Sequence, residues 1–507
     1  MKAFLMYRDR DFDAKQPLPW NEQSLRQDLA LDTLFAAMAA GDEFIFEVSK
    51  RAVLTGIHNR PDDIFYRQDV LKDCRSNPAI VRNIYRIAAE GLESEKKNYL
   101  GFLCRYPSGI LSRSIEILQL CVEALRQLRN IADEYAGRFM SDGFVTLFTT
   151  LKRELSDDYF ATIEGHLTTL KFSDGVLMSA GLGRGNKGVN YVLHRPSNLK
   201  QGWLERVFGR SSVYAYTIAD RDEAGARALS ELRDRGIDLV ANALAQSCDH
   251  ILSFFNALRT ELAFYIGCLN LDARLSQLGA PVCFPVPSEA GERRHTCQGL
   301  YDVCLALTMK QKVVGNELNA DDKTLVIITG ANQGGKSTFL RSIGQAQLMM
   351  HSGMFVAAES FSANVCDNLF THYRREEDAT MSSGKLDEEL SRMNDIVNHI
   401  SPDSMLLFNE SFAATNEREG SEIARQIVTA LIEQNLKVCY VTHLYDFAHS
   451  FFERKPGNAI FLRAVRQDDG KRTYQLIEGE PLQTSYGKDL YIKMARKNPK
   501  DNLAVSP

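Results

Sequence analysis

The spacing of apolar residues predicts long helices over much of the first half of this chain. From Leu111 to Tyr135 apolar residues recur at steps of three and four, which places one apolar stripe along a long helix. A second helical stretch without proline covers residues 221 to about 278, with an interruption expected near Gly236. The first 160 residues are predicted to be almost wholly helical, and two helices of such length are typical of paired lever arms.

Between the two long helices the pattern becomes strand-like. Residues 165–218 carry glycines and alternating apolar segments at 189–193 and 213–217, which predicts a small β-rich insertion at the tips of the arms. Residues 281–300 are rich in proline and are predicted to link this region to a final domain. We therefore expect residues 1–290 to form an all-α core and lever region with a β-rich insertion at about 165–218, and residues 291–507 to form a second domain.

The final region alternates short apolar strands with helical segments. Residues 324–329, 405–408 and 438–442 are the predicted strands. Strands of this composition, separated by helices, indicate a parallel sheet covered on both faces. The expected fold class is therefore multidomain, an all-α region followed by an α/β domain.

One stretch of the final region matches a phosphate-binding pattern in full. Residues 330–337, GANQGGKS, fit G-x-x-x-x-G-K-[ST] between a predicted strand and a predicted helix. Backbone N–H groups of the glycines can close around a phosphate, Lys336 can reach the β- and γ-phosphates, and the Ser337 hydroxyl can bind Mg²⁺. The candidate nucleotide-binding residues are Gly330, Asn332, Gly334, Gly335, Lys336, Ser337 and Thr338.

A second glycine-rich pattern has a different meaning. Residues 183–188 spell G-x-G-x-x-G, but a strand-like segment and Pro196 follow, whereas a dinucleotide fingerprint must open a helix. We do not predict a dinucleotide site there.

The segment 405–410, MLLFNE, has the form of a Walker B strand. An Asp usually holds Mg²⁺ at the first polar position, and Asn409 stands there instead. Its amide oxygen can accept a hydrogen bond from a magnesium-bound water but brings no charge, so we expect weaker Mg²⁺ binding or slow turnover. Ser337 and Asn409 are the candidate metal-binding residues. Glu410 is the candidate base, and His443, at the end of the next strand, is predicted to point toward the nucleotide; with Lys336 they form the candidate catalytic set.

These residues resemble those of the DNA mismatch repair MutS family. The resemblance implies ATP as the nucleotide, an ABC-type ATPase fold, and a homodimer with composite sites in which a Ser-bearing segment of one subunit faces the other's γ-phosphate. That segment corresponds to residues 379–385, with Ser382 and Ser383 as alternatives, a solvated turn being the competing interpretation. The matching residues are 327–341, Asn409, Glu410, Thr415, Glu419, Gly420, Thr442, His443 and 479–487, with weaker likeness at 66–71 and 261–263.

Two departures from the family pattern change the expectation. Residues 313–316, VVGN, stand where the family commonly has an aromatic residue against the adenine, so looser packing is expected there. Residues 41–47 superficially resemble the mismatch-reading Phe-x-Glu wedge, but they lie in a predicted helix that fits core packing. The sequence is therefore predicted to be a short MutS-like homologue that lacks the mismatch-reading domain.

Charge suggests where DNA could bind. The formal net charge of the chain is −5, so a nucleic-acid site must be a local patch. Residues 171–210 hold seven basic and two acidic residues, and this falls on the predicted insertion, where the family clamps duplex DNA. Arg184, Lys187 and Arg195 are the candidate DNA-binding residues; an ordinary solvated surface is the alternative.

The remaining features concern the compartment and competing functions. An early charged N-terminus, the absence of a long apolar run and ten scattered cysteines predict a cytoplasmic protein with reduced, buried thiols. The leading hypothesis is an ATP-controlled DNA clamp with slow hydrolysis, acting in repair or recombination on duplex, mismatched or branched DNA. The alternative is a nucleotide-gated protein scaffold with little turnover or DNA contact. An ABC-type transporter subunit or a chromosome-organising ATPase is disfavoured by the closing segment and by the lack of an LSGGQ-like stretch.

Overall fold

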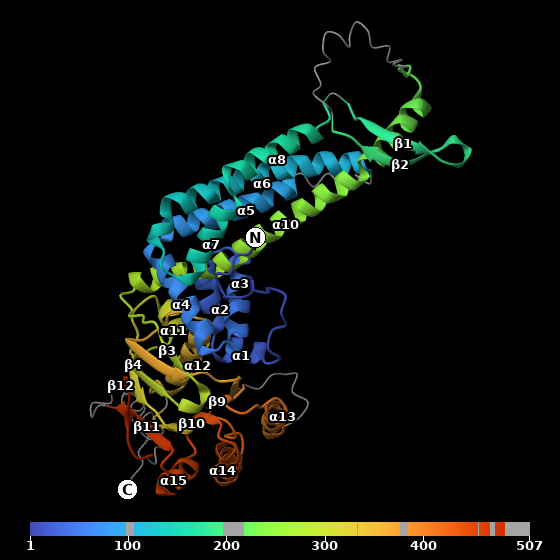
Figure 1. The fold of residues 1–507 in the computed structure, drawn as a ribbon. Coiled ribbons are helices and arrows are strands. Elements are labelled where there is room, and N and C mark those ends of the chain that lie inside the picture. The colour runs from blue at the N-terminus through green and yellow to red at the C-terminus, as the bar shows by residue number, and fades with distance from the viewer. Residues whose placement is uncertain are drawn as a thin grey trace, which may run out of the picture. The chain divides into compact units, whose positions relative to one another are not determined.

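The computed structural model has a mixed α/β architecture with several sheets (Figure 1). It describes residues 1–97, 106–173, 175–195, 217–331, 333–375, 384–454, 456–466 and 472–481. The chain separates into two compact units. The first consists of Met1–Ala3, Ala79–Phe139 and Phe144–Arg259, and the second of Phe4–Pro78, Met140–Gly143 and Thr260–Pro507.

Helices make up most of the first unit. They are α5 (Pro78–Lys97), α6 (Pro107–Tyr135), most of α7 (Asp142–Glu154), α8 (Asp157–Leu170) and the first part of α10 (Glu223–Gln277). The apolar stripe predicted for α6 is confirmed, because Ile115, Leu118, Val122 and Leu125 are all buried. Burial of apolar area at about 25 cal/mol per Å² is what holds such helices together.

The predicted interruption at Gly236 is wrong, because α10 runs without a break through this residue. A Cβ atom at Gly236 would lie 2.8 Å from Cε of Met178. The glycine therefore gives space for a neighbouring side chain, and tertiary packing outweighs its poor helix propensity of about 1 kcal/mol.

A hairpin of β1 (Met178–Leu182) and β2 (Gly188–Leu193) lies at one end of the first unit's helices (Figure 1). It confirms the predicted strand at 189–193, whereas the strand predicted at 213–217 lies outside the described residues except for Thr217. The G-x-G-x-x-G stretch forms the turn of this hairpin, with Gly185 at φ 70°, and opens no α-helix. The structure thus supports excluding a dinucleotide site.

Two sheets lie in the second unit. The six-stranded sheet has the order β12-β11-β6-β10-β9-β8, and all its pairs are parallel except that of the edge strand β12, which confirms the predicted parallel arrangement. Its strands are β6 (Leu325–Thr329), β8 (Leu369–Tyr373), β9 (Met405–Asn409), β10 (Lys437–Val441), β11 (Ala459–Arg466) and β12 (Arg472–Glu478). The other sheet consists of β3 (Val286–Ser288), β4 (His295–Leu300), β5 (Asn316–Asn319) and β7 (Ser360–Asn364).

Nine α-helices in the described residues accompany these strands in the second unit, besides the C-terminal part of α10. The helices that alternate with the strands are α11 (Val303–Met309), α12 (Lys336–His351), α13 (Lys385–Val397), α14 (Glu417–Glu433) and α15 (Tyr445–Arg454). Four more precede them, namely α1 (Glu22–Asp28), α2 (Leu31–Ala39), α3 (Glu43–Thr55) and α4 (Pro61–Ser76). Asp42 caps α3 by accepting hydrogen bonds from the N–H groups of Phe44 and Ile45. Residues 43–47 therefore lie in a helix as predicted, whereas Gly41 and Asp42 lie in a break between α2 and α3 that was not predicted.

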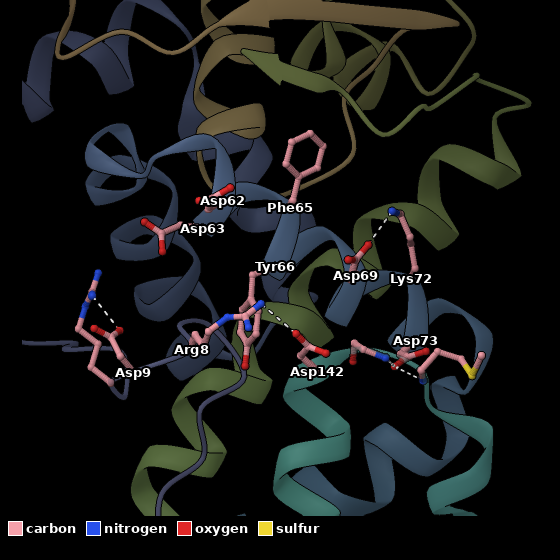
Figure 2. A pocket seen from close by; sticks show the side chains of 13 residues that line it. Arg8, Asp9, Asp62, Asp63, Phe65, Tyr66, Asp69, Lys72, Asp73 and Asp142 are labelled. Carbon is pink, nitrogen blue, oxygen red and sulfur yellow. Dashed lines mark hydrogen bonds and ion pairs between the residues drawn. The ribbon is translucent and has the colours of Figure 1, made fainter. Parts of the chain in front are cut away.

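A hollow of about 850 Å³ borders α4, residues 8–10 and residues 140–142 (Figure 2). Several of its carboxylates have partners within the hollow: Asp142 lies 2.9 Å from Arg8, Asp69 lies 2.8 Å from Lys72, and Asp73 accepts a 2.9 Å hydrogen bond from the N–H of Met140. These three carboxylates are therefore already paired with groups of the chain itself.

Two further expectations concern membranes and thiols. Among the helices that the structure describes, none combines the length and the apolar character needed to span a membrane. In the same residues the cysteines are free and nearly all buried, as predicted. Within the described part of the chain no cluster of three or more potential metal ligands occurs.

Candidate nucleotide-binding site

The phosphate-binding pattern adopts the predicted strand–loop–helix arrangement. Strand β6 ends at Thr329, and helix α12 begins at Lys336. Gly330 and Gly335 have φ values of 116° and 91°, which side-chain-bearing residues rarely adopt. A Cβ at Gly330 would also lie 2.9 Å from the backbone nitrogen of Ala464 on β11. The glycines are therefore required both by the backbone and by the neighbouring strand; Asn332 lies outside the described residues.

Lys336 is buried and is folded back onto this loop. Its Nζ donates hydrogen bonds to the carbonyl oxygens of Gly330, at 2.8 Å, and Ala331, at 3.0 Å. Burial lowers the pKa of Lys336 to about 8, and the nearby Glu410 carboxylate partly opposes this effect. The negative charge of a phosphate at the loop would favour the protonated form of Lys336, which burial disfavours.

Ser337 and Asn409 are in direct contact. The Ser337 hydroxyl donates a 2.8 Å hydrogen bond to Oδ1 of Asn409, although the two residues are 72 positions apart. Asn409 ends β9, which lies two strands from β6, with β10 between them. The two candidate metal-binding residues therefore meet at the carboxyl edge of the sheet, where a magnesium ion bound to a nucleotide would find a hydroxyl and an amide oxygen but no Asp.

Glu410 and His443 form a hydrogen-bonded pair beside Lys336. Nε2 of His443 lies 2.9 Å from Oε1 of Glu410 and 3.4 Å from Nζ of Lys336. This hydrogen bond, together with the positive charge of Lys336, lowers the pKa of Glu410 and keeps it a carboxylate near neutral pH. Because a carboxylate can only accept, His443 is the donor, and the three candidate catalytic residues converge at one point.

A hollow of about 420 Å³ adjoins the phosphate loop. Val313 and Val314 line it, as expected for the residues that precede the ATPase strand, and so does Thr338. Tyr474, from β12, also lines it and lies beside Gly335, so an aromatic residue is available there after all. The side chain of Asn316 fixes β12 through hydrogen bonds with the carbonyl of Tyr474 and the N–H of Leu476. Sequence reasoning missed Tyr474, because it is far from the loop along the chain and no motif surrounds it.

The remaining candidate residues lie elsewhere. Arg184, Lys187 and Arg195 are exposed residues of the first unit, the first two in the turn of the β1–β2 hairpin and the third after β2. At about 3.3 Å per residue, the six residues of β2 span roughly 20 Å, and this strand lies between Lys187 and Arg195, so the three charges are spread along the hairpin. Ser382 and Ser383 lie outside the described residues, as do residues 482–487 of the closing segment.

Two separate parts of the chain match known protein families. The family model "MutS2 N-terminal domain" matches residues 59–278, and the model "MutS domain V" matches residues 326–503. A DNA mismatch repair protein MutS of Chloroflexus aurantiacus is 24% identical over 264 residues, which is 48% of this chain and 27% of that protein. A protein of the same description from Leptospira interrogans is 29% identical over 273 residues, 51% of this chain and 31% of that protein.

The chain thus spans about a quarter to a third of the length of these curated relatives. The two family models cover separate parts of the chain and together more than half of it. The second model includes the phosphate loop, the Ser337–Asn409 contact and the Glu410–His443 pair. The descriptions of both models and of both relatives contain the name MutS. The chain belongs to the MutS family.

Proposed function

We propose that this chain is a MutS-type ATPase that binds ATP with Mg²⁺ and uses ATP binding to control a grip on DNA. The observation that carries the proposal is the convergence of Lys336, the Ser337–Asn409 pair and the Glu410–His443 pair at one edge of the sheet. P-loop ATPases need a phosphate cradle, a metal site and a water-orienting carboxylate, and the chain supplies a candidate for each.

Each residue has a proposed role. The amides around Gly334 and Gly335 and the Lys336 ammonium bind the phosphates. Ser337 and Asn409 hold Mg²⁺, which would neutralise charge on the phosphate oxygens. Glu410 orients a water and accepts its proton, and His443 keeps that carboxylate in place.

The nucleobase fits the neighbouring hollow. Its apolar wall and Tyr474 offer a flat surface against which an adenine can pack. Thr338 begins the helix beside this hollow and remains a candidate contact. In this proposal Tyr474 takes the role of the aromatic residue that is missing at 313–316.

Hydrolysis is proposed to be slow and to require two copies of the chain. Asn409 contributes no negative charge, which weakens the hold on Mg²⁺. The segment 379–385, with Ser382 or Ser383, would complete the site of a partner subunit. ATP would then favour the dimer, and by linkage DNA binding and ATP binding would influence each other equally.

DNA is proposed to bind at the β1–β2 hairpin through Arg184, Lys187 and Arg195. Exposed basic residues spread along a hairpin can follow a phosphate backbone, which gives affinity without sequence specificity. Helix α10 contributes residues to both compact units, so it is a continuous connection between the hairpin's unit and the nucleotide site's unit. The measurements below compare duplex, mismatched and branched DNA to find which of them the chain prefers.

A second candidate function follows from Asn409. With a neutral residue at the metal position, the chain could act as a nucleotide-gated protein scaffold that hardly turns over. Such a scaffold would bind ATP and dimerise without responding to DNA.

One set of measurements tests these proposals. We expect purified protein to bind ATP, to become dimeric with ATP and Mg²⁺, and to hydrolyse ATP at a rate that changes with duplex, mismatched or branched DNA. Lys336→Ala should abolish all three effects, because the phosphates lose their cation. Protein that neither retains ATP nor changes its oligomeric state would refute the function; ATP-driven dimers indifferent to every DNA would favour the scaffold.

A further inference from the structure

The backbone that carries Glu410 is held in an unfavourable conformation. Glu410 and Phe412 have φ values of 55° and 60°, in the left-handed region, where non-glycine residues pay roughly 1–2 kcal/mol each. A Cβ at Gly420, on α14, would lie 2.3 Å from the carbonyl oxygen of Phe412, so the helix packs directly against this turn. Such a conformation persists only when surrounding contacts fix it.

Three hydrogen bonds from two elements, β10 and α13, provide those contacts. The N–H of Glu410 donates to the carbonyl of Val441 on β10 at 2.9 Å. The hydroxyl of Tyr440, also on β10, donates to the carbonyl of Ser411 at 2.8 Å. The N–H of Phe412 donates to Oε2 of Glu389 on α13 at 2.7 Å. Each of the three residues 410–412 is therefore held by a separate hydrogen bond.

A buried histidine adds a second link between the same turn and α13. His372, on β8, has its pKa lowered to about 4 by burial, so the ring is neutral near pH 7. Its Nε2 lies 2.9 Å from the carbonyl oxygen of Glu389, which can only accept, so Nε2 carries the proton. Nδ1 lies 2.7 Å from the Ser411 hydroxyl, which also donates a 2.6 Å hydrogen bond to the backbone carbonyl of His372, so Ser411 contacts His372 at two points.

Glu389 is thus used twice, through its carboxylate and through its carbonyl. Its side chain is 2% exposed, although it belongs to a helix with an otherwise charged surface. Burying a carboxylate is costly unless it accepts hydrogen bonds, which indicates that the Phe412 contact is important to this position.

We propose that Glu389 is a positioning residue for Glu410: with His372 it fixes the 410–412 turn and so aims the Glu410 carboxylate toward the phosphate loop. This inference rests on the proposed ATPase function.

The test compares two neighbouring glutamates of α13 in the full chain. Glu389→Ala should lower kcat about tenfold, because the turn loses its anchor, while the Kd for a fluorescent ATP analogue stays within about twofold. Glu389→Gln retains an acceptor for the Phe412 N–H and should return kcat to within about threefold of wild type. Glu388→Ala is the matched control, since the ion pair of Glu388 among the described residues is with Arg392 on the same helix, and it should leave kcat within about twofold.

The outcomes separate the inference from the function on which it rests. A wild-type enzyme that hydrolyses ATP, with a Glu389→Ala variant of equal kcat, overturns the inference and leaves the function intact. A fall in nucleotide-binding stoichiometry parallel to kcat would reveal a merely structural role and also overturns it. If the wild-type protein does not hydrolyse ATP, both the inference and the proposed ATPase function are refuted. Should Glu389→Ala fail to fold, Ser411→Ala decides: a fivefold lower kcat with unchanged Kd supports the positioning role, and an unchanged kcat refutes it.

Discussion

Asn409 is the uncharged member of the proposed metal site. Its Oδ1 accepts a 2.8 Å hydrogen bond from the Ser337 hydroxyl. What it lacks is charge, and a charge-assisted hydrogen bond to a metal-bound water is roughly twice as strong as a neutral one.

Asn409→Asp is expected to strengthen Mg²⁺ binding. The concentration of Mg²⁺ that gives half-maximal ATP hydrolysis should fall severalfold, and kcat should rise, because the new carboxylate attracts the ion. Steady-state ATPase assays across a Mg²⁺ titration measure both quantities. Asn394→Asp, which adds the same charge on an exposed part of α13, should change neither, and an unchanged Mg²⁺ dependence in Asn409→Asp would refute the proposed cause of slow turnover.

The lysine of the phosphate loop makes ATP binding sensitive to alkaline pH. The pKa of Lys336 is lowered to about 8 by burial, and the negative charge of bound phosphates would raise it. Between these two pKa values, binding takes up a proton, so affinity falls as pH rises through about 8, by at most tenfold per unit.

We therefore expect the Kd for ATP to be nearly constant from pH 6.5 to 7.5 and to rise clearly by pH 9. Equilibrium titration with a fluorescent ATP analogue in constant-ionic-strength buffers measures this. Lys336→Arg, whose guanidinium stays charged, should bind with little pH dependence in this range. A wild-type Kd that stays flat to pH 9.5 would contradict the assignment.

At the scale of elements, the β1–β2 hairpin is the part with the clearest testable role. Its turn presents Arg184 and Lys187 to solvent. Each phosphate contact contributes about 0.9 to the slope of log affinity against log salt.

Arg184→Ala combined with Lys187→Ala should weaken duplex binding at 50 mM salt about tenfold or more and reduce the salt slope by up to about two. Fluorescence anisotropy with labelled duplex over a salt series gives both values. Lys152→Ala with Arg153→Ala removes the same charge from α7 and should have little effect. Equal affinity of the hairpin variant and wild type would show that these residues do not bind DNA.

At the scale of the whole molecule, the buried carboxylate of Glu261 joins the N-terminal segment to the C-terminal half of α10. Glu261 accepts hydrogen bonds from the N–H groups of Leu5, Met6 and Phe12, at 2.6, 3.2 and 2.6 Å. Burial nevertheless raises its pKa to about 7, despite these three donors. The folded protein therefore keeps a proton that the unfolded chain releases between about pH 4.5 and 7.

Because that pKa is raised, the contribution of Glu261 to stability is full below about pH 4.5 and is lost as pH rises through about 7. The side chain of the Glu261→Gln variant cannot ionise. As pH rises over that window, the free energy of unfolding of wild type should therefore fall relative to that of the variant, by up to roughly 1.4 kcal/mol per pH unit. Urea denaturation at pH 5, 6, 7 and 8 tests this. Glu317→Gln, at an exposed position, should leave the difference constant, and parallel stability curves for Glu261→Gln and wild type would argue against it.

Short sequence patterns alone determined many of the secondary-structure elements of this protein and its phosphate loop. The strands at 324–329, 405–408 and 438–442, the long helix after Leu111 and the loop–helix junction at Lys336 all follow from periodicity and from motifs contained in a few neighbouring residues. Parallel pairing also followed, because buried apolar strands alternating with helices have few other arrangements. Such features depend on side chains and backbone that are close along the chain, which a sequence displays directly.

Only the tertiary structure decided how distant residues meet. It places Tyr474 beside the phosphate loop, connects Glu389 and His372 to the turn after Glu410, and continues α10 through Gly236, where Met178 occupies the space beside the glycine. Each of these depends on contacts between residues with no fixed spacing, and burial then sets the energy of the contact. A sequence pattern carries neither, because the neighbours that decide conformation and pKa come together only when the chain folds.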